Sequence, residues 1–184
     1  MAVNLQAKPN SRSQSEKWPL FRSDRLARLA EIEHWHFWFV GRRALVGRLI
    51  GRYLNQAPDL ILDLGCGTGS MTQALSQQGY RVVGMDLRLE GLHSVRRFLP
   101  NAMLVQANAE HLPFKDGKLT SALFLDALEH LDEGRSASEL ARILQPGGPA
   151  IVAVPAISWF WSYRDEDAGH RQRYSLKRLV WLFN

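Results

Sequence analysis

Short apolar runs alternate with amphipathic segments from about residue 60 to the end of the chain. Five of these runs have the length and apolar content of buried strands: LILDL (60–64), YRVVGMD (80–86), AMLVQA (102–107), LTSALFLD (119–126) and PAIVAVP (149–155). Three intervening segments carry apolar residues at helical spacing and end at Gly79, Pro100 and Pro146. This alternation predicts an α/β fold, a doubly wound Rossmann-like parallel sheet of five strands with flanking helices.

The N-terminal region has a different pattern. Residues 1–17 are polar and rich in Ser, Asn and Gln, which predicts a disordered tail. From about residue 22 to residue 56, apolar residues recur at helical spacing in two segments, and we expect Gly41 to separate them. We therefore expect one domain over residues 18–184, with a helical N-terminal part and a core at about 57–155.

The last ten residues, SLKRLVWLFN (175–184), predict an amphipathic helix that reaches the end of the chain. The run at 149–155 would then be an apolar edge of the sheet, and natural proteins normally cover such edges. We therefore expect the C-terminal strands of the fold to be missing and the chain to be a C-terminally incomplete fragment.

The composition and net charge of the chain indicate what kind of protein it is. The chain has 184 residues, of which 46% are hydrophobic and 22% charged, as is typical of a single globular domain. The net charge of +5 comes from scattered basic residues, so we expect no nucleic-acid partner, although contact with an anionic lipid surface fits the charge. A single cysteine, Cys66, and the lack of a membrane-length apolar run predict a cytoplasmic protein without a transmembrane segment.

The stretch ILDLGCGTGS (61–70) places Asp63 just before three alternate glycines, Gly65, Gly67 and Gly69. In such sheets, ligands bind beyond the carboxyl ends of the strands. The glycine order departs from G-x-G-x-x-G, and an acid before it would repel a pyrophosphate, which argues against a nicotinamide-dependent oxidoreductase. The pattern suits a ligand with a cationic end, such as the ammonium and sulfonium groups of S-adenosylmethionine.

Asp86 ends the second predicted strand, 21 residues after Gly65. A carboxylate at this place can accept hydrogen bonds from both hydroxyls of a ribose. The spacing serves NAD and S-adenosylmethionine equally well, so it indicates a nucleoside without choosing between them. The alternative is an exposed acid at the end of a strand.

Five motifs occur in order along the chain: LDLGCGTG (62–69), GMD (84–86), ANAEHLPF (107–114), LDALEHL (125–131) and ARILQPGG (141–148). Together they resemble the class I S-adenosylmethionine-dependent methyltransferases, closest to the small-molecule branch that includes ubiquinone and menaquinone biosynthesis enzymes. The resemblance covers about residues 35–184. It implies S-adenosylmethionine as cofactor and methyl transfer as the reaction.

The resemblance also assigns residues to parts of the cofactor. Asp63 and the glycine loop would hold the methionine part, and Asp86 would hold the ribose. Leu87 would lie beside the adenine, with Asn108 and Ala109 at its polar edge; the family usually has Asp where Asn108 stands, so we expect weaker cofactor binding. The resemblance further implies that Asp126 faces the cofactor and that Arg42 or Arg43 pairs with the methionine carboxylate.

All six tryptophans lie outside residues 39–158. They gather in EHWHFWFVGRR (33–43), in PAISWFWSYRDEDAGHRQRYS (155–175) and near both ends of the chain. Both segments can close over the carboxyl ends of the strands, and the resemblance implies that residues 22–56 form a lid. We expect an apolar or aromatic substrate pocket there; the alternative is ordinary lid core.

A hydroxyl acceptor needs a base, and His170 is the candidate, with Asp165, Glu166 and Asp167 able to orient it. The family pattern GHRxRY matches residues 169–174 of this chain. His130 is a second candidate, although a structural role for it, or a salt-bridged loop around His170, is the alternative reading. No cluster of His, Cys and Asp has ligand spacing, so the sequence implies no metal.

These features favour a methyltransferase acting on a small or lipid-like acceptor at oxygen or carbon. The D/N-PP-Y/F tetrad of amino-group methylation is absent after the fourth predicted strand, where LDALEH stands. The alternative from another class is a non-catalytic S-adenosylmethionine-binding module or partner subunit. A nicotinamide-dependent oxidoreductase is the weaker alternative.

Overall fold

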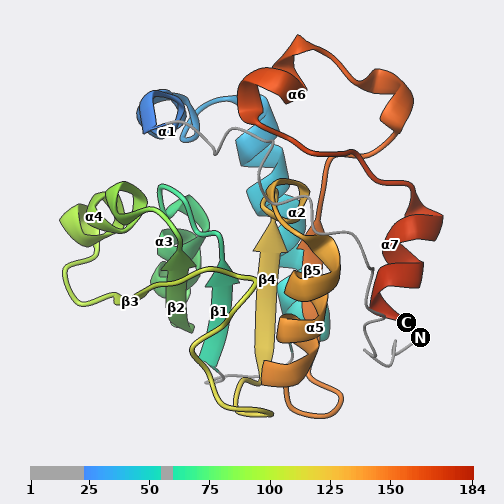
Figure 1. Ribbon diagram of the computed structural model, residues 1–184. Helices are drawn as coiled ribbons and strands as arrows, with labels where there is room; N and C mark the ends of the chain where they lie inside the picture. Colours follow the sequence, from blue (N-terminus) through green and yellow to red (C-terminus); the bar gives the residue numbers. More distant parts are fainter. Residues whose placement is uncertain (1–22, 55–59) are drawn as a thin grey trace.

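The computed structural model describes residues 23–54 and 60–184 (Figure 1). The tail predicted at residues 1–17 lies outside the described residues, as do the ends of the predicted helical part. The elements follow in the order α1 (Ser23–Ile32), α2 (Phe37–Tyr53), β1 (Leu60–Leu64), α3 (Ser70–Gln77), β2 (Arg81–Asp86), α4 (Leu89–Phe98), β3 (Met103–Gln106), β4 (Ser121–Leu125), η1 (Leu128–His130), α5 (Glu133–Ile143), β5 (Ala150–Ala153), η2 (Ser158–Phe160), α6 (Tyr163–Ala168) and α7 (Leu176–Phe183).

The five strands form one parallel sheet in the order β3-β2-β1-β4-β5. The chain builds outward from β1 to β3, then returns to the other side of β1 for β4 and β5. The switch point therefore lies between β1 and β4, where a doubly wound sheet opens a crevice at its carboxyl edge. The predicted Rossmann-like fold is confirmed.

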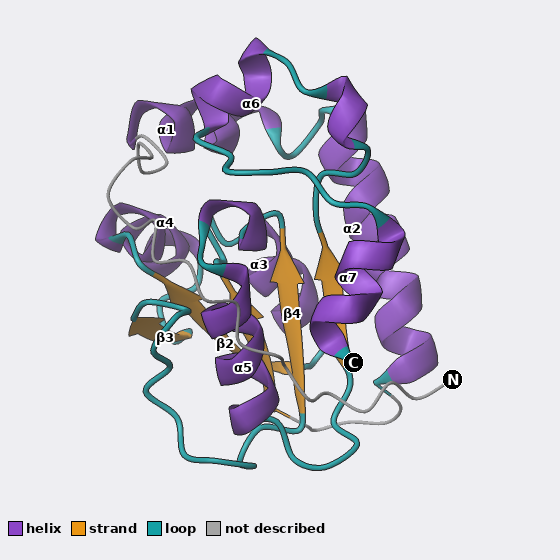
Figure 2. Ribbon diagram, turned by 45° about the vertical axis from the view of Figure 1, so that its right-hand side comes forward, coloured by secondary structure: helices purple, strands orange, loops and turns teal. Residues whose placement is uncertain are grey.

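Helices cover both faces of the sheet, as Figures 1 and 2 show. Alternate residues of β1 point to opposite faces, because side chains in a strand alternate. Ile61 packs with Val46 and Ile50 of α2 and with α3. Leu62 lies in the other core, with Leu140 of α5 and residues of α7. This two-sided burial explains why the strands are almost continuously apolar.

The break between the first two helices differs from the prediction. Gly41 lies inside α2, and the break falls at residues 33–36 instead. His36 caps α2, because its side chain accepts a hydrogen bond from the backbone N–H of Trp38 (3.3 Å). Gly41 has open space around it, so the helix continues through this glycine without any contact that requires it.

Two segments far apart in the sequence meet above the carboxyl edge of the sheet. Helix α1 and the N-terminal end of α2 lie there beside α6 and its flanking loops (Figure 1). Arg25 of α1 forms an ion pair with Asp167 of α6. Helix α6, which the sequence pattern did not predict, begins at a capping box between Ser162 and Asp165. In the part of the chain that is described, no helix is long and apolar enough to cross a bilayer.

Candidate active site

A cavity of about 410 Å³ opens at the carboxyl edge of the sheet. This volume is within the usual range for small-molecule sites. Its floor consists of the loop after β1 and the ends of β2, β3 and β4, and its walls come from α1, α2 and the residues around His170. Nearly all the residues predicted from the sequence line it: Arg42, Asp63, Gly65, Gly67, Asp86, Leu87, Asn108, Ala109, Asp126, His130 and His170. Arg43 and Gly69 do not.

The glycine loop is held against the end of β2. The backbone N–H groups of Gly65 and Cys66 donate to the carbonyl of Met85, at 2.8 and 2.9 Å. Gly65 has a φ of +69°, and a Cβ atom there would lie 2.6 Å from that of Ala127, so only glycine fits. Gly69 plays a different part, because it precedes α3 with a φ of +85° and sets the direction of that helix.

Asp86 connects this loop to the start of α4. One carboxylate oxygen accepts from the backbone N–H of Gly67 (2.9 Å) and the other from that of Arg88 (2.8 Å). Burial raises the pKa of Asp86, although these bonds oppose the shift. Each oxygen has a further lone pair, so the carboxylate can support the loop and still accept from a ligand.

Asp63 lies at the bottom of the cavity and is 2% exposed. The hydroxyl of Thr72 in α3 donates to its Oδ2 at 2.6 Å. Burial raises the pKa of Asp63 to about 6, with the Thr72 bond and the charge of Arg42 acting in the opposite direction. A buried carboxylate with a raised pKa gains most from a cationic ligand, because a positive charge restores the interactions that burial removed.

The two arginines have separate surroundings. Arg42 lines the cavity and forms an ion pair with Asp126, while its Nε has no hydrogen-bond partner among the described residues. Arg43 points away and donates to the carbonyl of Glu33 (2.6 Å) and the hydroxyl of Ser70 (2.8 Å). The structure therefore favours Arg42 over Arg43 as a ligand-binding residue.

Asp126 is held in an unusual backbone conformation directly after β4. Its φ of +49° is uncommon for a residue with a side chain, and its N–H donates to the carbonyl of Ala153 (2.8 Å). Strained residues of this kind often mark functional positions. The conformation turns the chain from β4 into η1, which carries Glu129 and His130.

The polar edge expected for the adenine lies at the end of β3. The side-chain oxygen of Asn108 accepts from the backbone N–H of Glu110 at 2.9 Å, which shapes the turn. That oxygen keeps a second lone pair for a ligand. Ala109 is buried beside it, and Leu87, which follows the neighbouring strand β2, also lines the cavity and is 43% exposed.

His170 and His130 come together in one wall of the cavity, with their ring centres 5.0 Å apart. The Nδ1 of His170 bonds to Asp165 Oδ1 (2.9 Å), so of the three acids predicted to orient it, Asp165 does so. Asp167 instead pairs with Arg25, and Glu166 is exposed. Although burial raises the pKa of Asp165, bonds from Arg173 and His170 hold it well below its usual range.

Burial favours the neutral form of both imidazoles. Burial lowers the pKa of His130 to about 4, and burial also lowers the pKa of His170. The Nδ1 of His130 bonds to the carbonyl of Gly169 at 3.1 Å. Glu129, beside them, was missed by the sequence analysis; burial raises its pKa to about 8. The motif LEH was the available signal, but only His130 was selected from it.

The aromatic segments contribute less to the cavity than expected. Of the tryptophans among the described residues, Trp38 lines the cavity, together with Phe39. Trp35 and Trp159 are 69% and 84% exposed. Trp18 lies outside the described residues. The apolar walls come mainly from Leu26 and other aliphatic side chains instead.

These residues fit S-adenosylmethionine. Asp63 offers a buried negative charge to a cationic centre, and Asp86 and Asn108 have acceptors where ribose and adenine would lie. A Cβ added at Gly67 would lie 3.9 Å from Leu26, and both residues line the cavity, so a side chain there would fill it. The donor set is therefore consistent with the cofactor that the motifs indicate.

Comparison with known proteins agrees with this reading. Residues 62–152 match the family model described as a methyltransferase domain. These 91 residues are thus similar to a methyltransferase domain. The relatives include an uncharacterised methyltransferase of Mycobacterium tuberculosis, 33% identical over 129 residues, which are 70% of this chain and 50% of the relative. An O-methyltransferase of Aspergillus sclerotiorum is 31% identical over 110 residues, covering 55% of this chain and 42% of that one.

The fold is shared with solved structures of the same class. An S-adenosylmethionine-dependent methyltransferase of Methanosarcina mazei matches with a TM-score of 0.64 and 24% identity, over 73% of this chain and 81% of that chain. This likeness shows a fold shared with an S-adenosylmethionine-dependent methyltransferase. The chain spans about half the length of the curated relatives it matches.

Proposed function

We propose that the protein transfers a methyl group from S-adenosylmethionine to a small or lipid-like acceptor, at oxygen or carbon. The observation that carries this proposal is the contrast between the two sides of the cavity. Asp63 and Asp86 lie on the side of the glycine loop. The helical N-terminal part contributes the apolar side chains Leu26, Leu29, Trp38 and Phe39, beside the charged residues Arg25, Glu33 and Arg42. An apolar acceptor would lose its water against these apolar side chains.

The chain's own residues would hold the cofactor as follows. Asp63 faces the cationic methionine end, and Asp86 accepts from the ribose hydroxyls. Asn108 and Ala109 border the adenine, and Arg42 is placed for the methionine carboxylate. When bound, S-adenosylmethionine supplies an electrophilic methyl group on a sulfonium centre, and alignment of the acceptor with that group provides much of the acceleration.

We place His170 and His130 at the reacting atom of the acceptor. Both side chains lie in the cavity wall, and Asp165 fixes the orientation of His170. Helix α1 and the start of α2 would act as the lid over this space. A buried hydrogen bond supports this lid: the hydroxyl of Thr68 in the glycine loop donates to the carboxylate of Glu33, which follows α1, at 2.6 Å.

The resemblance to the small-molecule branch with ubiquinone and menaquinone enzymes supports the choice of acceptor. The name of the Aspergillus relative, an O-methyltransferase, supports oxygen as an acceptor atom. The tetrad of amino-group methylation is absent after β4. We therefore favour phenols, quinols and other hydroxyl compounds with an apolar body over nucleic acid.

Transfer of labelled methyl groups from S-adenosylmethionine tests the proposal. The purified chain would be incubated with phenolic, quinol and fatty-acid acceptors, and with RNA as a comparison. We expect label in an apolar small molecule, and at least a tenfold lower rate for His170→Gln with unchanged affinity for S-adenosylhomocysteine. Cofactor binding without transfer to any acceptor would instead favour the non-catalytic binding module.

A further inference from the structure

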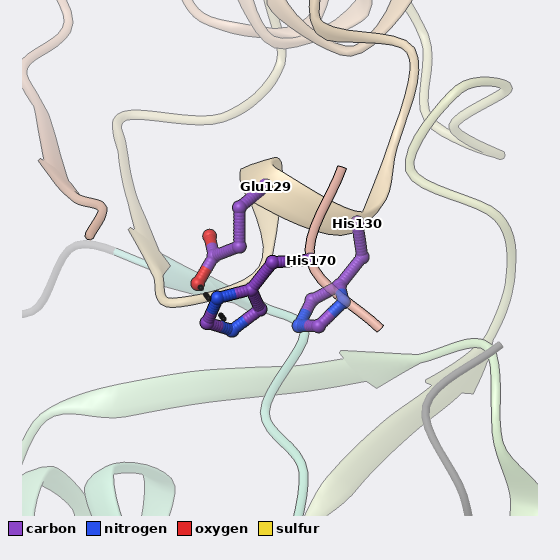
Figure 3. Close-up of side chains that lie close together, drawn as sticks. All are labelled: Glu129, His130 and His170. Carbon is purple, nitrogen blue, oxygen red and sulfur yellow. Dashed lines mark ion pairs between the residues drawn. The ribbon is translucent and has the colours of Figure 1, made fainter. Parts of the chain in front are cut away.

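Three potential metal ligands meet in the wall of the cavity. Glu129 and His130 come from η1, and His170 comes from the loop after α6. One donor atom from each lies within 4.8 Å of the others, and His170 Nε2 is 3.8 Å from Glu129 Oε1. Figure 3 shows these side chains gathered at one point.

Hydrogen bonds determine which nitrogen of each imidazole carries the proton. Asp165 accepts two bonds from Arg173, at 2.7 and 2.8 Å, and remains a carboxylate, so His170 Nδ1 must donate to it. The carbonyl of Gly169 can only accept, so His130 Nδ1 must also donate. In the neutral form of each ring the lone pair is therefore on Nε2. Histidines oriented through Nδ1 in this way are typical of metal sites.

Glu129 adds a buried acceptor to this pair. Its side chain is fully buried, and neither carboxylate oxygen has a hydrogen-bond partner among the described residues. The lone pair of His170 Nε2 thus faces the carboxyl group of Glu129 across 3.8 Å. Two acceptors that face each other in a buried site need a positive centre between them, either a proton or a metal ion.

We propose that Glu129, His130 and His170 bind a divalent first-row transition-metal ion. Two imidazoles and one carboxylate are a common donor set for Mn²⁺, Fe²⁺, Co²⁺ and Zn²⁺, whereas Mg²⁺ and Ca²⁺ prefer oxygen ligands alone. Bonds of about 2.0–2.2 Å bring such donors closer together than 4.8 Å, so the side chains must move inward on binding. The positive charge of nearby Arg42 is compensated by its ion pair with Asp126.

The position of the cluster indicates what the ion would do. All three residues line the cavity, and three protein ligands leave coordination positions open. An acceptor hydroxyl could bind there and lose its proton more readily. This consequence rests on the proposed function, but metal binding itself does not.

Metal binding is measured on the full chain after removal of metals by a chelator, with Mn²⁺ followed by electron paramagnetic resonance and Co²⁺ by its visible absorption. We expect one ion per chain and at least tenfold weaker binding of Mn²⁺ in Glu129→Gln and in His170→Gln. Glu166→Gln is the matched control, because Glu166 is an exposed acid of α6 outside the cluster. Mg²⁺ should not displace Co²⁺ at equal concentration.

Absence of stoichiometric binding in the wild-type chain would overturn the proposal. Unchanged binding in folded Glu129→Gln would also overturn it, since this variant removes a ligand with almost no change in shape. Circular dichroism establishes that each variant is folded. Titration with S-adenosylhomocysteine in the presence of chelator separates the two proposals: cofactor binding without metal binding refutes the metal site alone.

Discussion

The hydroxyl of Thr72 donates a 2.6 Å hydrogen bond to the buried carboxylate of Asp63, yet burial still raises the pKa of that carboxyl to about 6. The folded protein therefore holds a proton on Asp63 more tightly than the unfolded chain does. The stability from this group is present below about pH 4 and is lost as pH rises through about 6. The site is thus destabilised at neutral pH until a cation occupies it.

Asp63→Asn tests whether the buried charge of Asp63 destabilises the folded protein at neutral pH. An Asn oxygen still accepts from Thr72, and no charge is buried, so we expect the cofactor-free variant to be more stable at pH 7. The gain should approach about 3 kcal/mol, the equivalent of a shift of roughly two pKa units. Urea denaturation between pH 4 and pH 7.5 measures it, with exposed Glu166→Gln as control. An identical pH dependence in Asp63→Asn and wild type would contradict the assignment.

The charge of Asp63 also predicts ligand preference. We expect calorimetry to show binding of S-adenosylmethionine but not of NAD, because a pyrophosphate would meet a buried carboxylate. Asp63→Asn should weaken binding of S-adenosylmethionine more than binding of its uncharged-sulfur product, S-adenosylhomocysteine. Tight binding of NAD would refute the cofactor assignment.

Asp86 supports both the glycine loop and the expected ribose. Asp86→Ala removes the acceptors for Gly67 and Arg88 together with those for a ribose. We expect a loss of more than tenfold in affinity for S-adenosylhomocysteine, measured by calorimetry. Arg81→Ala, an exposed change at the opposite end of β2, should leave the affinity unchanged. Equal affinities for wild type and Asp86→Ala would remove Asp86 from the site.

Gly91 predicts a packing effect that the motifs do not reveal. A Cβ atom at this position of α4 would lie 2.5 Å from the carbonyl oxygen of Gly67. Gly91→Ala should therefore displace the glycine loop, destabilise the protein by about 1–3 kcal/mol and weaken cofactor binding.

Gly47→Ala is the matched control for this change. Gly47 lies in α2 with nothing within 4 Å of an added Cβ, so alanine there should stabilise the protein by about 0.5–1 kcal/mol. Thermal denaturation of both variants distinguishes the two glycines. Similar melting temperatures for Gly91→Ala and Gly47→Ala would show that α4 does not need close approach to the loop.

The sequence predicted the sheet well because its strands are buried on both faces and read as apolar runs. It was less reliable for the helices. Gly41 was expected to break a helix but lies within α2. The N-cap of α2 is His36, which precedes Gly41, and the open space around Gly41 lets the helix continue through it. Helix α6 is too short for a periodic pattern, and its capping-box residues, Ser162 and Asp165, were not recognised in the sequence.

For the site, local sequence alone predicted the glycine loop and the strand-end residues Asp63 and Asp86. Positive φ angles favour glycine, and a buried strand is an apolar run, so both features can be recognised within a few residues. Tertiary structure decided how distant groups combine. Asp165 rather than Glu166 orients His170, and Glu129 faces that histidine without a partner among the described residues. Such contacts depend on how the region of α6 lies over the end of β4. Residue spacing within one segment cannot predict the distance between two segments that are far apart in the sequence.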